Sequence, residues 1–91
     1  MRFDWDPAKA RENEQKHGVT FEEAATCFED PHGCYFRNEA PSYEDRLILV
    51  AFSSKRRLLF VVHAEVERDF IRIVSARKAS RAQRRVYEGL D

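Results

Sequence analysis

The sequence predicts an α+β fold, in which two early helices and one late helix pack on an antiparallel sheet of about four strands. Three runs in the second half are rich in β-branched and aromatic residues: 46–53, 57–65 and 70–77. The links between these runs are short enough for hairpins, which favours a meander. Helix-start signals occur before the first run and after the last one. A length of 91 residues fits one domain, which we expect to span residues 1–91.

The first helix is predicted to begin at Asp6-Pro7, where an acidic cap precedes proline at the first helical position. We expect it to end at about residues 16–17, with Gly18 in the left-handed conformation that often follows a helix. Two alanines are its only apolar residues after the proline. Most of this helix therefore cannot be core, and at least one face meets solvent, a ligand or a partner.

A second helix is predicted to begin at Thr20, which forms a capping-box pattern with Glu23. The apolar residues that follow have helical spacing and define one buried stripe: Phe21, Ala24, Ala25 and Phe28. The turn cluster at 30–33 ends this helix, residues 34–37 are expected to form a short edge strand, and residues 38–45 a polar loop.

The last helix is predicted to begin after Ser80, with Gln83 completing a second capping box. Its apolar residues give it only a narrow edge with which to pack on the sheet: Ala82, Val86 and Leu90.

The charges are divided by position along the chain. Residues 1–45 carry 5 Lys and Arg against 11 Asp and Glu, a net charge of −6, whereas residues 46–91 carry 11 against 5, a net of +6. The cations are densest in residues 75–85, around the start of the last helix. Cations there oppose the helix macrodipole, so a bound phosphate would explain them. The alternative is a solvated surface cluster.

Two polar residues interrupt the apolar strands, His63 and Arg72. A two-residue loop at Glu67-Arg68 would place them directly opposite each other, with Val61 opposite Val74 and Leu59 opposite Ala76. A guanidinium beside an imidazole disfavours the charged imidazole, so the histidine would remain a usable base. The alternative is a strand-end histidine beside a solvent-facing arginine.

No metal or cofactor is expected. Cys27, His32 and Cys34 match no familiar zinc spacing, and two cysteines do not make a disulfide framework. With three glycines, a phosphate-cradling loop is implausible. The chain shows no signal peptide and no apolar run of membrane-spanning length, so we expect a cytoplasmic protein without a membrane partner.

Several blocks of the sequence, in order, resemble the BrnT family, the toxins of the type II BrnT/BrnA toxin–antitoxin system. They are Phe3-x-Trp5-Asp6, Lys16-His17-Gly18-Val19-Thr20-Phe21-Glu22-Glu23-Ala24, Phe28-x-Asp30-Pro31, Arg57-Leu58-Leu59-Phe60-Val61-Val62-His63 and Arg72-Ile73-Val74-Ser75-Ala76-Arg77-Lys78-Ala79-Ser80. The resemblance implies a RelE-like fold and metal-independent RNA cleavage that stops translation. It also implies a BrnA-like antitoxin with a ribbon-helix-helix DNA-binding part, expected in a 2:2 complex on operator DNA.

For RNA cleavage we expect His63 to be the base or acid, with His17 as the second candidate. Arg72 and Arg77 are expected to stabilise the phosphate in the transition state. The residues expected to contact the RNA backbone are Lys9, Lys78, Arg81 and Arg85. The alternative function is a non-catalytic module that binds nucleic acid or protein through the same basic patch.

Overall fold

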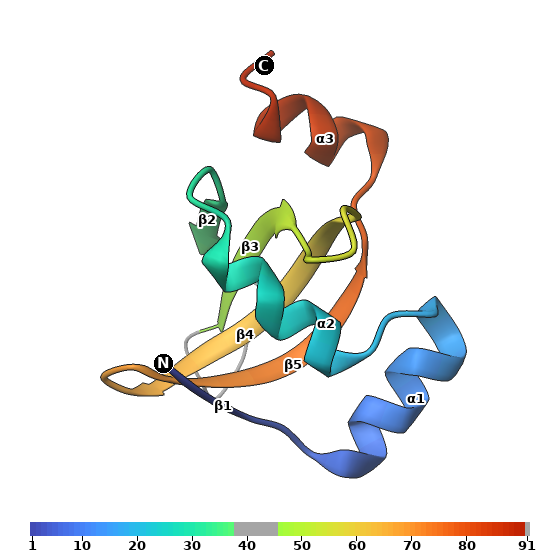
Figure 1. The fold of residues 1–91 in the computed structure, drawn as a ribbon, viewed down its shortest axis with the longest axis vertical. Helices are drawn as coiled ribbons and strands as arrows, with labels where there is room; N and C mark the ends of the chain where they lie inside the picture. Colours follow the sequence, from blue (N-terminus) through green and yellow to red (C-terminus); the bar gives the residue numbers. More distant parts are fainter. Residues whose placement is uncertain (38–45, 91) are drawn as a thin grey trace.

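The computed structural model describes residues 1–37 and 46–90, which form a five-stranded sheet with three helices (Figure 1). The elements in chain order are β1 (Arg2–Asp4), α1 (Pro7–His17), α2 (Phe21–Thr26), the 3-10 turn η1 (Cys27–Glu29), β2 (Cys34–Arg37), β3 (Arg46–Phe52), β4 (Leu58–Glu67), β5 (Phe70–Lys78) and α3 (Arg81–Tyr87). The predicted α+β class is confirmed. The polar loop predicted at 38–45 lies outside the described residues.

The sheet has the order β1-β5-β4-β3-β2, and the strands from β2 to β5 are antiparallel neighbours, as predicted. β1 was not predicted. It pairs in parallel with β5, with Arg2 beside Phe70 and Asp4 beside Arg72, so the sheet is mixed and has one more strand than expected. A strand of three residues is too short to show a periodic pattern in the sequence.

The caps of α1 confirm the predicted boundaries. The Asp6 carboxylate accepts a hydrogen bond from the Ala8 N–H at 2.8 Å, and Pro7 occupies the first turn. Gly18 has a φ of 68°, the left-handed conformation expected after the helix.

One polar side chain joins α1 to the sheet. Asn13 is 7% exposed, and its amide nitrogen donates to the Ala76 carbonyl at 2.7 Å and to the Val19 carbonyl at 3.0 Å. Its amide oxygen accepts from the Ala76 N–H at 3.1 Å. The side chain therefore bonds to the edge of β5 as a neighbouring strand would, which fixes a polar helix that has little apolar surface of its own.

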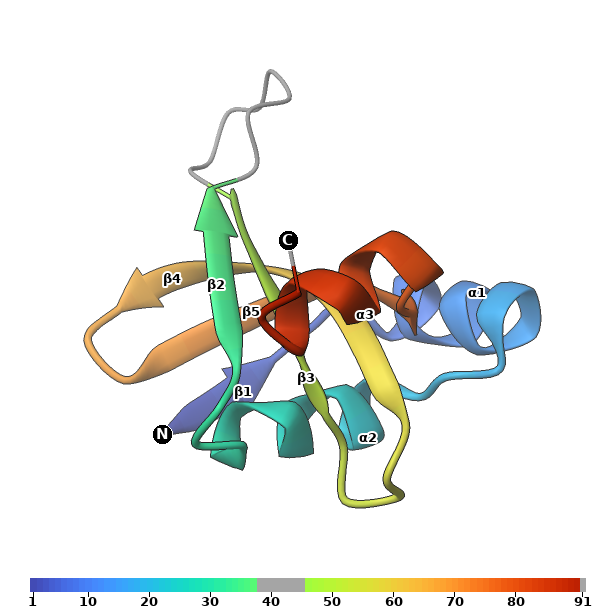
Figure 2. The same cartoon turned by 90° about the horizontal axis from the view of Figure 1, so that it is seen from above.

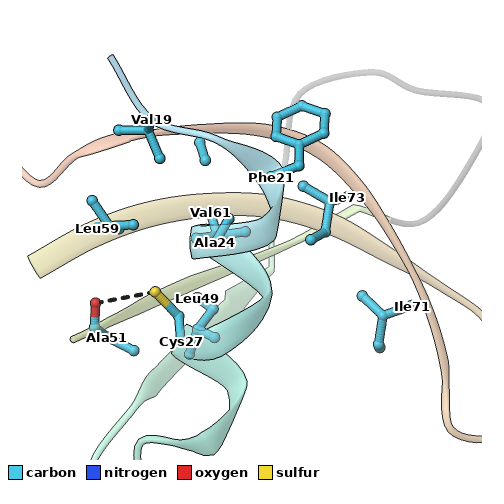
Figure 3. Close-up of a cluster of buried hydrophobic side chains, with 11 residues drawn as sticks. Val19, Phe21, Ala24, Cys27, Leu49, Ala51, Leu59, Val61, Ile71 and Ile73 are labelled. Carbon is cyan, nitrogen blue, oxygen red and sulfur yellow. Dashed lines mark hydrogen bonds between the residues drawn. The ribbon is translucent and has the colours of Figure 1, made fainter. Parts of the chain in front are cut away.

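The hydrophobic core lies between α2 and one face of the sheet (Figure 3). Phe21 and Ala24 are fully buried, and they pack with side chains from the three longest strands, β3, β4 and β5, and from the α1–α2 link. The other members of this cluster are Val19, Cys27, Leu49, Ala51, Leu59, Val61, Ile71, Ile73 and Ala76. Phe28 is partly buried beside them, so the predicted stripe on the second helix is confirmed.

Glu23 is a buried charge beside this core. The Thr20 hydroxyl accepts from the Glu23 N–H at 3.0 Å, which is one half of the predicted capping box. The Glu23 carboxylate turns instead to Arg57, with which it forms a two-pronged ion pair, and to the Ser53 hydroxyl at 2.7 Å. Arg57 holds the pKa of Glu23 below its usual value, and the Ser53 hydrogen bond acts in the same direction against the effect of burial.

The predicted alignment of β4 with β5 is wrong. The turn falls at Arg68-Asp69, and irregularities between Val62 and His63 and between Glu65 and Glu67 shift the register further. His63 consequently lies opposite Ile73, and Arg72 lies opposite Ala64. Because side chains alternate along a strand, a slip of one residue places Arg72 on the opposite face of the sheet from His63.

The other predicted cross-strand pairs change for the same reason. Val61 lies opposite Ala76 rather than Val74, and Leu59 lies opposite Lys78 rather than Ala76.

The capping box of α3 is present as predicted, since Ser80 and Gln83 exchange hydrogen bonds. Its predicted packing edge is wrong. Val86 is 37% exposed and Leu90 is 60% exposed. The helix lies on the side of the sheet away from α2 (Figure 2), and it is held by Tyr87. The Tyr87 hydroxyl donates to Asp30 at 2.7 Å, and its ring meets the ring of Phe52 edge-on at 5.3 Å.

Candidate nucleic-acid interface

A cleft of about 200 Å³ lies between α1 and β5. Its walls are Lys9, Glu12, Asn13, Lys16, His17, Val74 and Ser75. The helical residues in this set are three or four positions apart, so they share one face of α1. Asn13 lies in the middle of that face and bonds to β5, which brings the predicted site residues Lys9 and His17 over the strand. Both are exposed.

Ser75 also lines this cleft, although it was not among the site residues expected from the sequence. Ser75 pairs with Val62, while Ile73 pairs with His63, so Val74 is an extra residue on β5. Such a bulge interrupts the alternation of side chains, and Val74 and Ser75 both line the cleft. A hydroxyl in an otherwise apolar strand run was a signal in the sequence, but the bulge that directs it toward α1 was not.

A second group of cations lies where β5 leads into α3. The guanidinium of Arg77 covers the Phe60 ring at 4.1 Å and donates to the Lys78 carbonyl at 3.2 Å and to Gln83 Oε1 at 3.3 Å. Lys78, Arg81 and Arg85 are exposed. The structure therefore brings four of the predicted site residues to one corner of the molecule.

The start of α3 is a weaker anion site than the sequence suggested. The helix has only seven residues, and the Ser80 side chain already accepts from the Gln83 N–H. The charge at this corner comes from the arginine and lysine side chains rather than from free N–H groups.

His63 lies in the interior, away from both groups of cations. It is 1% exposed, and the rings of Phe28 and Tyr35 meet its imidazole edge-on at 4.8 Å and 6.0 Å. Burial lowers its pKa, so the ring is neutral at pH 7. In this position the imidazole has no access to a substrate, and it has the contacts of a core residue.

Arg72 forms an ion pair with Asp4. Its Nε and Nη2 donate to the two carboxylate oxygens at 3.1 Å and 3.2 Å. This bidentate pair joins β5 to β1, and it separates Arg72 from His63, with which it was predicted to act.

Within residues 1–37 and 46–90, no three His, Cys, Asp or Glu side chains are grouped as metal ligands would be. Both cysteines are free. Cys27 is enclosed by the core, and burial raises the pKa of its thiol to about 12, which makes it unreactive. None of the described helices is both long and apolar enough to cross a membrane.

A family model described as the ribonuclease toxin BrnT of type II toxin–antitoxin systems matches residues 5–83. The chain belongs to the BrnT family. The 1.1 Å crystal structure of the ribonuclease toxin BrnT from Brucella abortus has a similar fold, with a TM-score of 0.68. The two chains are 24% identical over 89% of this chain and 99% of the Brucella chain. A comparison with curated protein sequences gives no match.

Membership of the BrnT family confirms the resemblance seen in the sequence, and it places the chain among the ribonuclease toxins of type II toxin–antitoxin systems. The family match spans residues 5–83, which include α1, the β5 residues that line the cleft and the start of α3. It therefore covers Lys9, His17 and the second group of cations except Arg85, which lies beyond residue 83.

Proposed function

We propose that this BrnT-family chain is an endoribonuclease that cleaves RNA at the α1–β5 cleft without a metal ion. The observation that supports this most directly is the meeting of Lys9, His17 and Ser75 on the walls of one cleft, in a family of ribonuclease toxins. A cation, an imidazole and a hydroxyl are side chains that can handle phosphate charge and protons.

RNA carries its own nucleophile, the 2′-hydroxyl next to the phosphodiester. The protein must position the phosphate, remove the proton from the 2′-hydroxyl and give a proton to the leaving 5′-oxygen. We assign proton transfer to His17, because an imidazole is the side chain that most often acts as a general acid or base. Lys9 would stabilise the charge that develops on the phosphorane, and Ser75 would hydrogen-bond to a phosphate oxygen.

The cations at the end of β5 would bind the RNA phosphates that flank the cleaved bond. Arg77, Lys78, Arg81 and Arg85 supply charge there, and we propose that Arg77 is the one nearest the reacting phosphate. RNA binding through such contacts weakens as salt rises, because counterions are released from the phosphates. Arg72 is paired with Asp4, so it would stabilise the pairing of β5 with β1 rather than contact the RNA.

We propose that cleavage inhibits translation in the cytoplasm. We further propose that a BrnA-like antitoxin with a ribbon-helix-helix part silences the chain in a 2:2 complex on operator DNA. A ribbon-helix-helix dimer has two equivalent arms, so it can hold two toxins related by its two-fold axis.

The test is cleavage of a defined RNA by the purified chain in EDTA, with His17→Ala as the variant and His32→Ala as the control. His32 is an exposed histidine outside the cleft. We expect wild-type and His32→Ala activity to survive chelation, and His17→Ala to lose about 10²-fold or more. Cleavage that stops in EDTA would contradict the mechanism, and equal activity of the two histidine variants would contradict the assignment of His17.

RNA binding without cleavage by the wild-type chain would instead support a non-catalytic binding module. In that case Lys9→Ala should weaken binding, and Lys55→Ala, in the exposed turn after β3, should not.

A further inference from the structure

An apolar groove of about 220 Å³ lies beside α3, on the face of the sheet that α2 does not cover. We call it the α3 groove, and its walls are Phe36, Ile48, Val50, Phe60, Gln83 and Val86. Phe36 is 39% exposed and Val86 is 37% exposed. Large apolar side chains gathered around an open groove are typical of a surface that binds another protein.

The floor of the α3 groove suits aliphatic side chains. Among the described residues Gln83 is the one polar wall residue, and Gln83 Oε1 already accepts from the Ser80 N–H at 2.8 Å and from Arg77. The Phe60 ring is covered by the Arg77 guanidinium. An RNA base would therefore find few free polar partners in the groove, whereas a leucine, isoleucine or methionine could fill the space between the branched side chains.

The rim of the α3 groove is cationic. Residues 77–88 carry four arginines and one lysine against a single acid, Glu88. Arg77 lies over the floor, and the Arg84 guanidinium lies 5.8 Å from the ring centre of Phe52, the β3 residue beyond Val50. An apolar floor with a positive rim is complementary to an amphipathic segment whose polar side is acidic.

We propose that the α3 groove is the docking site for an acidic amphipathic segment of the antitoxin. This inference rests on the antitoxin partner of the proposed function. The segment inserts two or three aliphatic side chains between Phe36 and Val86 and sets its carboxylates against Arg77 and Arg84. Because Arg77 also belongs to the proposed RNA surface, a segment bound in the groove removes one of the cations that RNA requires.

The test measures the affinity of the chain for the BrnA-like antitoxin of the proposed function, by titration calorimetry with purified proteins. Val86→Glu places a like charge in the groove and should weaken binding by about 30-fold or more, because it removes a central contact. Val86→Lys removes the same contact but keeps the favourable charge, and it should have a clearly smaller effect. The matched control is Val66→Glu, at a valine that is 43% exposed on β4 and does not line the groove.

A second variant, Phe36→Thr, tests the opposite wall on β2 and should also weaken binding, since threonine is favourable in a strand but removes the ring. Affinity should fall as salt rises for the wild-type chain, and less steeply for Arg84→Gln.

Four results would overturn the proposal. Unchanged affinity of Val86→Glu would show that the antitoxin docks elsewhere. A loss for Val86→Lys as large as that for Val86→Glu would exclude an acidic segment. A wild-type dimer that Val86→Glu converts to a monomer would identify the groove as a contact between two copies of this chain. If Val86→Glu weakens RNA binding but not antitoxin binding, the α3 groove is part of the RNA site instead.

Failure of the proposed function would look different. A wild-type chain that cleaves no RNA but binds the antitoxin through Val86 would contradict the ribonuclease assignment and leave the groove assignment intact. If the wild-type chain binds no antitoxin, both the proposed antitoxin partner and the proposed docking site in the α3 groove are wrong.

Discussion

The two faces of the sheet are built in opposite ways. Toward α2, every side chain of the core cluster is at most 4% exposed, and the buried charge beside it, Glu23, is paired with Arg57. Toward α3, the strands carry apolar side chains that remain open, and the helix that lies over them has no buried residue. The same strands supply both faces by alternating their side chains.

The two faces therefore have different roles: the α2 face stabilises the fold, and the α3 face offers a surface for binding. The α2 face removes enough apolar surface from water to hold the fold together, so the α3 face is available for a partner. The α1–β5 cleft is intermediate, because it is open to solvent but its position depends on buried hydrogen bonds of Asn13. Substitutions should therefore act on stability at the α2 face, on binding at the α3 face, and on both at Asn13.

The largest effect on stability is expected from Phe21→Ala on the closed face. Phe21 is fully buried, so its loss would leave a cavity in the core, and the free energy of unfolding should fall by about 3–5 kcal/mol. Phe36→Ala removes the same ring from the open face and should lower it by less than about 1 kcal/mol, because Phe36 already meets solvent. Urea unfolding measures both. Equal losses would show that the two faces contribute alike to stability.

The next effect is expected at Asn13, which contributes to stability and also fixes α1 beside the cleft. Asn13→Ala leaves the N–H and carbonyl of Ala76 without their partners and should cost about 2–3 kcal/mol. Because α1 is then no longer fixed to β5, RNA cleavage should fall as well. Gln15→Ala, at an exposed position of the same helix, is the control and should change neither quantity. A destabilised variant with full activity at low temperature would disprove the link.

A smaller effect with a defined pH dependence is expected at Glu23. Its pKa in the folded state lies below the unfolded value of 4.5, so its ion pair with Arg57 stabilises the fold fully above about pH 4.5. Glu23→Gln should cost about 1–2 kcal/mol at pH 7. As the pH falls through the folded pKa of Glu23, this contribution is lost, and the two proteins should converge in stability. Unfolding curves from pH 7 to pH 3 test this, and a constant difference would contradict it.

The smallest effect is expected at the attachment of α3. Tyr87→Phe removes one hydrogen bond to Asp30 at a partly exposed site and should lower global stability by less than about 1 kcal/mol. Hydrogen exchange of α3 amides should nevertheless become faster, because the helix has no buried residue to hold it. Tyr35→Phe on β2 is the control. Unchanged exchange in α3 would show that contacts other than the Tyr87 hydroxyl fix the helix.

Local chemistry made the helix ends predictable. Asp6, Thr20 and Ser80 each accept a hydrogen bond from the first turn of the helix that follows, as the sequence indicated. The meander was predictable too, because three long β-rich runs with short links have few other arrangements. These features depend on residues close together in the sequence.

The features that could not be predicted depend on residues that are far apart in the sequence. β1 is defined by its pairing with residues 70–72, and the bulge at Val74 by the pairing of β4 with β5. The later turn and the irregularity between Glu65 and Glu67 moved Arg72 out of line with His63, and the bulge at Val74 directed Ser75 into the cleft. His63 itself shows that a polar residue at the end of an apolar strand run can belong to the core, where two aromatic rings enclose it.

The pairing of β1 with β5 also has a consequence for synthesis on the ribosome. Residues 2–4 emerge first, but their partners at 70–72 emerge last among the strands, and the Ala76 backbone that Asn13 needs comes later still. Contacts this far apart in sequence form late and slowly. A chain released before residue 70 therefore has neither the β1 edge of the sheet nor the cleft. We therefore expect chains that end before residue 70 to be unable to cleave RNA at the proposed site.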